Sequence, residues 1–192
     1  MNIRHAFVAA PALSLAYALI RIVDGFDGSR GPGLAWTGGH LAFLAALVLF
    51  VPVMWEMRRL AGRTAAATIA AVVGTAGAVA AIAQFAIDIV VGFMAADHEA
   101  MRVLSDKVSS VPGVPLVVYQ VGPMLFYIGL FALAAVLAAK GVLKVWAALL
   151  VLAAVLLPAA SLDLLPLASL FLGGGLLPLA LRPTASATTA SR

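Results

Sequence analysis

The stretch from Thr64 to Met94 constrains the fold most, because it is almost wholly apolar and carries a single charged residue, Asp88. A helix needs about 20 apolar residues to cross the hydrocarbon core of a bilayer. The stretch exceeds that length, and a soluble domain offers no environment for so long an apolar helix. We therefore expect it to contain a membrane-spanning helix.

Further apolar segments of similar length follow one another along the chain, at residues 6–23, 34–55, 116–139, 142–160 and 164–181. The composition agrees, since 64% of the residues are hydrophobic and 10% are charged, against roughly 45–50% and about 25% in soluble domains. We predict an all-α, polytopic transmembrane helix bundle of about six spans, forming one domain over residues 1–182. Residues 183–192, rich in Ser, Thr and Ala, are predicted to be a disordered cytoplasmic tail.

The first and last segments each have an alternative interpretation. Residues 16–18 resemble a signal-peptide cleavage site, but we interpret residues 6–23 as a retained first helix. The segment 164–181 is short and contains three consecutive glycines, Gly173 to Gly175, and Pro178. It is therefore either a complete span or a broken, re-entrant helix, which is stable at membrane depth only when other helices bury it.

Lysine and arginine are distributed unevenly between the two sets of loops. With the N-terminus in the cytoplasm, eight of the 12 face the cytoplasm: Arg4, Arg58, Arg59, Arg63, Lys140, Lys144, Arg182 and Arg192. The other four, Arg21, Arg30, Arg102 and Lys107, lie on the outer side. Because cytoplasmic loops carry the excess of positive charge, both termini are predicted to be cytoplasmic and the protein to be multi-pass in the inner (plasma) membrane.

The one long loop, residues 95–115, carries a helical pattern. Asp97 is a candidate N-cap, and Met101, Leu104 and Val108 recur at helical spacing. We expect a short amphipathic helix that lies on the outer surface of the bundle.

Polar side chains in the spans gather in the predicted outer half and share helix faces there. They are Ser14, Tyr17, Arg21 and Asp24 in the first span, Trp36 and His40 in the second, Gln84 and Asp88 in the third, and Tyr119, Gln120 and Tyr127 in the fourth. The third span continues its stripe with small residues, Gly74, Gly77, Ala81 and Gly92, which allow a neighbouring helix to approach closely. Pro123 is expected to kink the fourth span near Tyr119. The pattern predicts a polar and aromatic pocket that opens to the outer side.

Asp88 is the strongest catalytic candidate, because a carboxyl group within a span costs several kcal/mol and usually serves a partner or a cavity. An acid that keeps its proton in an apolar site can donate it to a substrate. His40 is the second catalytic candidate, as a base or a ligand of a metal or haem. His5 and His98 lie outside the spans, so a bis-histidine haem site is not supported, and no metal site is predicted. The expected substrate-binding residues are Gln84, Gln120, Tyr119, Tyr127, Trp36, Tyr17, Arg21 and Asp24.

Structural roles compete with these functional ones. Asp88 could form an ion pair with Arg21, and Arg21 could instead pair with Asp24 near the interface. Trp36, Tyr17 and Tyr119 could belong to the aromatic belt at the outer membrane surface.

Two segments of the C-terminal third resemble small multi-pass membrane proteins of bacteria. They are Gly-Pro-Met-Leu-Phe-Tyr at residues 122–127 and Gly-Val-Leu-Lys-Val-Trp-Ala-Ala-Leu-Leu at residues 141–150. The resemblance implies an integral membrane protein and carries no activity with it.

Three functions remain open. The first is an enzyme that isomerises or cyclises a lipophilic, isoprenoid-like molecule by acid catalysis, with no metal or nucleotide cofactor. The second is a transporter or a component of a proton or cation pathway, for which a homo-oligomer could build the missing polar path. The third is an accessory or assembly subunit. Membrane lipids and a lipophilic small molecule are the expected partners, and nucleic acid is not. The sequence contains no cysteine and no nucleotide-binding or hydrolase motif.

Overall fold

The computed structural model describes residues 3–26 and 30–182, and every regular element in these residues is helical. The elements are α1 (Ile3–Asp24), α2 (Leu34–Leu60), α3 (Ala65–Met94), α4 (His98–Ser109), the π-helical segment η1 (Pro115–Val121), α5 (Gly122–Ala139), α6 (Val145–Ala160), the 3-10 turn η2 (Leu162–Leu164) and α7 (Leu165–Ala180). The predicted all-α class is confirmed. The predicted tail, 183–192, lies outside the described residues.

Five helical stretches in the described residues are long and apolar enough to cross a membrane: α1, α2, α3, η1 with α5, and η2 with α7. Of the two alternatives left open for the last segment, the unbroken helix is the one observed, because α7 runs through the three glycines and Pro178. A Cβ on Gly175 would collide with the carbonyl oxygen of Ala147, so this glycine allows α6 and α7 to pack closely.

The apolar helix α6 is shorter than these five stretches, at 16 residues or about 24 Å. The expected span at 142–160 loses its first turn because the chain reverses there. Gly141 has a positive φ of 68°, and the amides of Val142 and Leu143 donate to the carbonyl of Leu137 at the end of α5. This arrangement terminates α5 and leaves Lys144 as the N-cap residue of α6.

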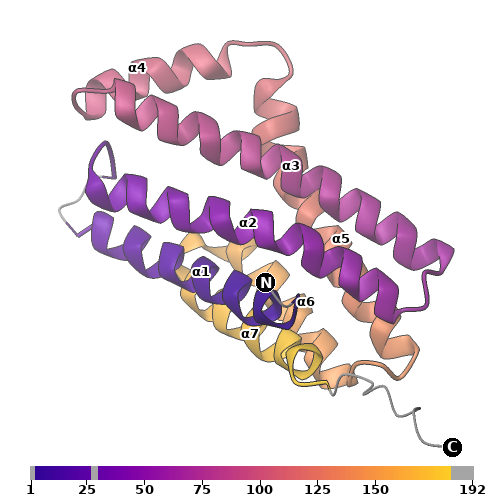
Figure 1. Ribbon diagram of the computed structural model, residues 1–192. Helices are drawn as coiled ribbons and strands as arrows, with labels where there is room; N and C mark the ends of the chain where they lie inside the picture. The colour runs from indigo at the N-terminus through magenta and orange to yellow at the C-terminus, as the bar shows by residue number, and fades with distance from the viewer. Residues whose placement is uncertain (1–2, 27–29, 183–192) are drawn as a thin grey trace, which may run out of the picture.

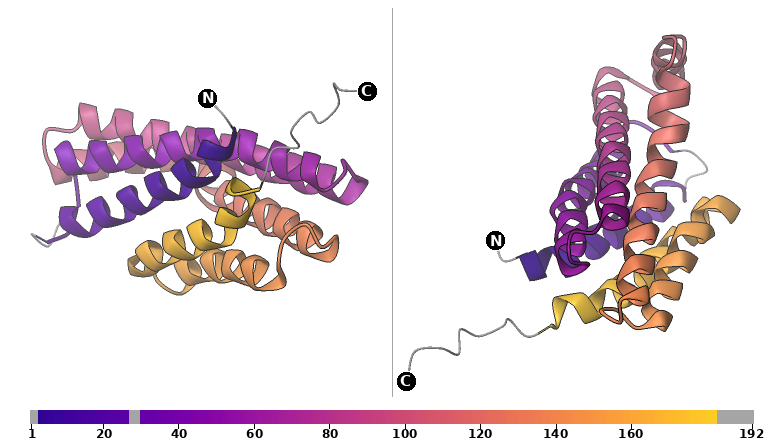
Figure 2. Two further views of the ribbon diagram at one scale, coloured as in Figure 1. Left: turned by 60° about the horizontal axis from the view of Figure 1, so that its bottom comes forward. Right: turned by 90° about the vertical axis from the view of Figure 1, so that its right-hand side faces the viewer.

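Six helices form a closed ring: α1 packs on α2, α2 on α3, α3 on α5, α5 on α6, α6 on α7, and α7 on α1. Within the ring, α2 also contacts α5. Figures 1 and 2 show these long helices running roughly along one direction, with α4 beside one end of α3. We call that end of the bundle the α4 end and the other, which carries the α2–α3 turn, the opposite end.

The closest packing in the ring is between α3 and α5. A Cβ on Gly77 would collide with the backbone of Phe126, and one on Gly129 would collide with the backbone of Gly74. The small-residue stripe of the third span therefore packs against a helix, as predicted. Large apolar side chains such as Val79 and Ile128 remain exposed on the outer faces of α3 and α5, as expected for helices that contact lipid.

The predicted loop helix is present as α4. The Asp97 side chain accepts a hydrogen bond of 2.8 Å from the amide of Ala100, which satisfies one of the free N–H groups of the first turn. Met101 is buried, and Arg102 pairs with Glu99 on the polar side of the helix. The Asp97 cap and the apolar face were both expected from the spacing.

The expected distortion near Pro123 takes the form of a π-helical segment. Proline has no N–H to donate to the carbonyl of Tyr119, four residues earlier. The segment η1 instead uses the wider i to i+5 pattern, and the amide of Gly122 donates to the carbonyl of Val117. The helix continues into α5 without a break, and Tyr119 lies on the widened turn, a feature frequent at functional sites.

Candidate functional site: a polar and aromatic cavity at the α4 end

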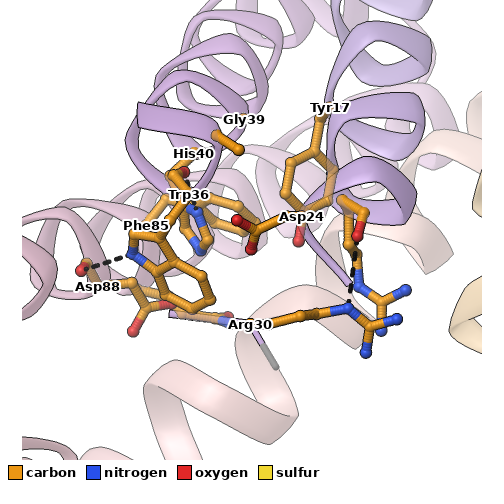
Figure 3. A pocket seen from close by; sticks show the side chains of 11 residues that line it. Tyr17, Asp24, Arg30, Trp36, Gly39, His40, Phe85 and Asp88 are labelled. Atoms are coloured by element: carbon orange, nitrogen blue, oxygen red, sulfur yellow. Dashed lines mark hydrogen bonds between the residues drawn. The ribbon is translucent and has the colours of Figure 1, made fainter. Parts of the chain in front are cut away.

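A cavity of about 250 Å³ lies between α1, α2 and α3 at the α4 end of the bundle. Figure 3 shows side chains from these helices and from the α1–α2 connection pointing into it. Its lining residues are Tyr17, Arg21, Asp24, Arg30, Ala35, Trp36, Gly39, His40, Gln84, Phe85 and Asp88. Most of the lining is polar or aromatic, in contrast to the Ala, Leu and Val that surround it.

Four rings form a continuous aromatic wall. The ring centroids of Trp36 and His40 are 3.9 Å apart, those of His40 and Phe85 5.1 Å, and those of Tyr17 and Phe85 5.4 Å. Gly92 makes room for this wall, because a Cβ there would strike the indole of Trp36. Such faces bind apolar and planar groups and attract positive charge.

The surroundings of His40 determine which of its ring nitrogens can accept a proton. Nδ1 lies 2.7 Å from the carbonyl oxygen of Trp36, one helical turn earlier. A carbonyl only accepts hydrogen bonds, so Nδ1 is the nitrogen that carries hydrogen. In the neutral ring Nε2 therefore has the free lone pair. His40 is buried, so its neighbours hold it in one orientation.

Asp88 is held from two sides. The hydroxyl of Tyr119 donates a hydrogen bond of 2.8 Å to Oδ1, and the indole Nε1 of Trp36 donates to the main-chain carbonyl at 3.4 Å. Tyr119 therefore fixes the carboxyl group without lining the cavity itself. Oδ2 remains available to carry a proton or to bind a ligand.

Gln84 lies one turn from Asp88 on α3 and also lines the cavity. Its amide oxygen is buried and has no hydrogen-bond partner among the described residues. A buried acceptor without a donor is costly. A donor group on a ligand or a water molecule in the cavity would satisfy it.

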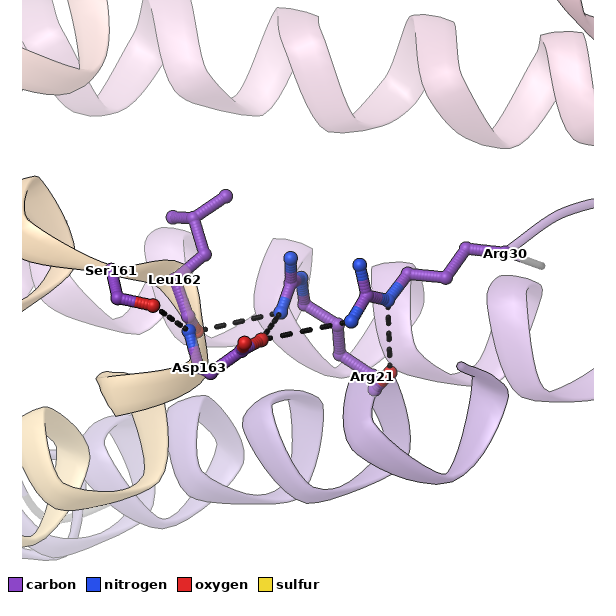
Figure 4. A network of polar contacts seen from close by, with 5 residues as sticks. All are labelled: Arg21, Arg30, Ser161, Leu162 and Asp163. Atoms are coloured by element: carbon purple, nitrogen blue, oxygen red, sulfur yellow. Dashed lines mark hydrogen bonds and ion pairs between the residues drawn. The ribbon is translucent and has the colours of Figure 1, made fainter. Parts of the chain in front are cut away.

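Two arginines from the cavity wall meet at one carboxylate. Nη1 of Arg21 lies 3.1 Å from Oδ1 of Asp163 in η2, and Nη2 of Arg30 lies 3.6 Å from the same atom. Figure 4 shows the two guanidinium groups converging on this side chain. Arg21 also donates to the carbonyl of Leu162. The network ties the C-terminal end of α1 to the turn before α7.

The cavity unites most of the predicted site residues: Asp88, His40, Gln84, Trp36, Tyr17, Arg21 and Asp24 all line it. Trp36 lines the cavity and is not simply part of a surface belt, and Arg21 forms its ion pair with Asp163, where the sequence suggested Asp88 or Asp24. Three expected residues do not line the cavity. Tyr119 contacts Asp88 from behind, and Gln120 is exposed because the π-helical turn points it outward.

Tyr127, the third, lies deeper, at a separate void of about 20 Å³ that is lined by α1, α2, α5, α6 and α7 and includes Ser14 and Ser169. Sequence reasoning missed Phe85 and Arg30 as lining residues. Phe85 follows Gln84 directly and reads as one more apolar residue of a long span. Arg30 lies in a connection whose path the helical period does not predict.

No group of three or more His, Asp or Glu side chains in residues 3–26 and 30–182 is placed to hold a metal ion. The chemical groups that line the cavity are the carboxyl groups of Asp24 and Asp88, the guanidinium groups of Arg21 and Arg30, the His40 imidazole, the Gln84 amide and the aromatic rings. Comparisons of the chain with family models, with curated proteins and with solved structures find no match.

Proposed function

We propose that this protein is a membrane-embedded enzyme that isomerises or cyclises a lipophilic, isoprenoid-like substrate by proton transfer. Asp88 is the general acid and His40 the general base. The observation that carries the proposal is that both residues line one aromatic cavity of about 250 Å³. Because Tyr119 binds Oδ1 of Asp88, Oδ2 is available to carry the proton. Because the Trp36 carbonyl binds Nδ1 of His40, Nε2 is the nitrogen that can accept a proton.

In this reaction, the proton on Oδ2 of Asp88 passes to one carbon of a substrate double bond, forming a C–H bond and a carbocation. The faces of Trp36, Tyr17 and Phe85 stabilise the positive charge. His40 Nε2 then removes a proton from a neighbouring carbon, and the electrons of that C–H bond form the new double bond. Transfer of the proton from His40 back to Asp88 restores the enzyme, so the cycle consumes no co-reactant.

The proposal includes six spans, with α6 as the short one, and both termini in the cytoplasm of a plasma membrane. The opposite end of the bundle carries Arg58, Arg59, Arg63, Lys140 and Lys144 at its turns. This concentration of positive charge supports a cytoplasmic location for that end. The cavity then opens toward the outer leaflet, from which a lipophilic substrate enters.

A transport role fits the geometry less well. A proton or cation pathway requires polar groups through both halves of the bundle. The buried polar side chains among the described residues are Ser14, His40 and Ser169, and the Thr75 hydroxyl and the Gln84 amide oxygen are further buried polar atoms. Thr75 is the one on the α3 half toward the opposite end, and a single hydroxyl does not make a pathway. Toward the opposite end the core consists mainly of apolar residues such as Phe50, Met54 and Leu130, which cannot relay a proton or bind a cation.

The test is native mass spectrometry, combined with chromatographic lipid analysis, of gently purified wild type, Asp88→Asn and His40→Gln. Asp106→Asn is the matched control, because it makes the same chemical change on the exposed face of α4. We expect wild type and control to carry one lipophilic ligand in its rearranged form, and the two cavity variants to carry the unreacted isomer. If no protein retains a specific ligand and Asp88→Asn is only less stable, the carboxyl group is structural and the subunit interpretation replaces this proposal.

A further inference from the structure

A second, larger hollow lies on the outer face of α3, beneath α4. Its volume is about 410 Å³, and it is lined by Ala86, Ile87, Val90, Val91, Met94, Leu104, Lys107 and Val108. We call it the α3–α4 groove. It is separate from the cavity described above, with which it shares no lining residue.

The groove is apolar except for one side chain. The α3 side contributes a row of aliphatic residues, of which Val90 and Met94 are 54% and 67% exposed. The α4 side contributes Leu104 and Val108 from the apolar face of that helix. No described segment of the chain fills the space between them, so a membrane-embedded protein would offer this surface to lipid acyl chains.

Lys107 is the exception, and its charge is not used within the protein. Among the other charged side chains of α4, Arg102 pairs with Glu99 at 2.6 Å and reaches Asp106 only at 4.0 Å, and these three groups together carry one excess negative charge. Lys107 forms no ion pair with any residue in the described part of the chain. A lysine whose aliphatic stem lies along an apolar groove can extend its ammonium group to the membrane surface.

We propose that the α3–α4 groove binds one anionic phospholipid, with an acyl chain between α3 and α4 and the phosphate group on Lys107. The position of the groove agrees with this, since α4 follows the last turn of α3 at the end of a span, where headgroups and acyl chains meet. A zwitterionic lipid could fill the same apolar space. The unpaired ammonium group favours a headgroup with net negative charge.

The experiment is native mass spectrometry of the full chain in mixed micelles that contain equal amounts of phosphatidylglycerol and phosphatidylcholine with identical acyl chains. Lys107→Gln removes the charge, and Ala86→Phe fills the groove. Lys140→Gln is the matched control, an exposed lysine at the opposite end of the bundle. Circular dichroism verifies that each variant retains its helix content.

We expect wild type and Lys140→Gln to retain one phosphatidylglycerol about fivefold more often than phosphatidylcholine. Lys107→Gln should retain a lipid without this preference, and Ala86→Phe should lose the retained lipid. An unchanged preference in Lys107→Gln, or unchanged retention in Ala86→Phe, overturns the proposal. A wild-type dimer that dissociates in Ala86→Phe also overturns it, because the groove would then be an interface between two copies of the chain.

Discussion

Tyr119 donates its hydroxyl hydrogen to Oδ1 of Asp88 over 2.8 Å, and this bond joins α3 to the π-helical segment η1. The π-helical turn changes the direction of the side chains before Pro123, so that Tyr119 points at α3 while Gln120 points outward. One local irregularity of the backbone thus positions the carboxyl group that the proposed chemistry requires.

Tyr119→Phe is expected to lower the free energy of unfolding by about 0.5–1.5 kcal/mol, since it removes one hydrogen bond to Asp88. Tyr127→Phe is the matched control, because no hydrogen bond joins the Tyr127 hydroxyl to a described residue. Thermal unfolding in detergent measures both. Equal midpoints for the two variants would show that the Tyr119 bond contributes nothing to stability.

Gly77→Ala is expected to destabilise the bundle by about 1–3 kcal/mol, because the added methyl group would collide with the backbone of Phe126. Gly38→Ala is the control, since a Cβ there meets no atom within 4 Å. At that helical position alanine should be neutral or slightly stabilising. A denaturant titration followed by helical circular dichroism compares them, and a Gly77→Ala variant as stable as Gly38→Ala would contradict the close packing of α3 on α5.

Apolar length and helical period predicted the elements of this fold well, because a span has to satisfy its backbone hydrogen bonds within itself. The helix α4 was also predictable from local sequence, because Asp97 caps its first turn and Met101, Leu104 and Val108 recur at helical spacing. The prediction was less accurate for α6, and it left open whether α7 is complete. The segment 142–160 loses its first turn because the chain reverses at Gly141, and a count of apolar residues does not predict that reversal. The helix α7 continues through Gly175 because this glycine packs closely on Ala147 of α6, a contact between helices that the sequence of α7 alone does not show.

The site was predictable where one helix face carries several polar residues, as with Tyr17 and Arg21, or with Gln84 and Asp88. Residues beyond such a stripe were not. Gln120 was expected to face the pocket because a regular α-helical period was assumed for the fourth span. The π-helical turn has a different period, and Gln120 is exposed. Asp163 was visible in the sequence, but its pairing with Arg21 joins residues 142 positions apart, and helical spacing has no bearing on that contact.

Arg21→Gln is expected to destabilise the protein more than Arg30→Gln does. The side chain of Arg21 is 14% exposed and lies 3.1 Å from Asp163, whereas that of Arg30 is 42% exposed and lies 3.6 Å away. Because Asp163 is itself 73% exposed, both effects should be small, about 1 kcal/mol or less. Unfolding midpoints at low and high salt test this, since screening should reduce the difference between wild type and Arg21→Gln. A larger loss for Arg30→Gln would contradict the assignment.

Acidification is expected to loosen α4 through Glu99. The hydrogen bond that Arg102 donates to it, at 2.6 Å between Nη2 and Oε1, lowers the pKa of this carboxyl group. A group with a lowered pKa in the folded state stabilises that state above its usual pKa of about 4.3, and this stabilisation is lost as the pH falls through the lowered value. A spin label on Val103→Cys, in a chain without other cysteines, reports the mobility of α4. Its mobility should rise on acidification in wild type. In Glu99→Gln at neutral pH it should already be raised, and a label that becomes less mobile in acid would contradict the role of this pair.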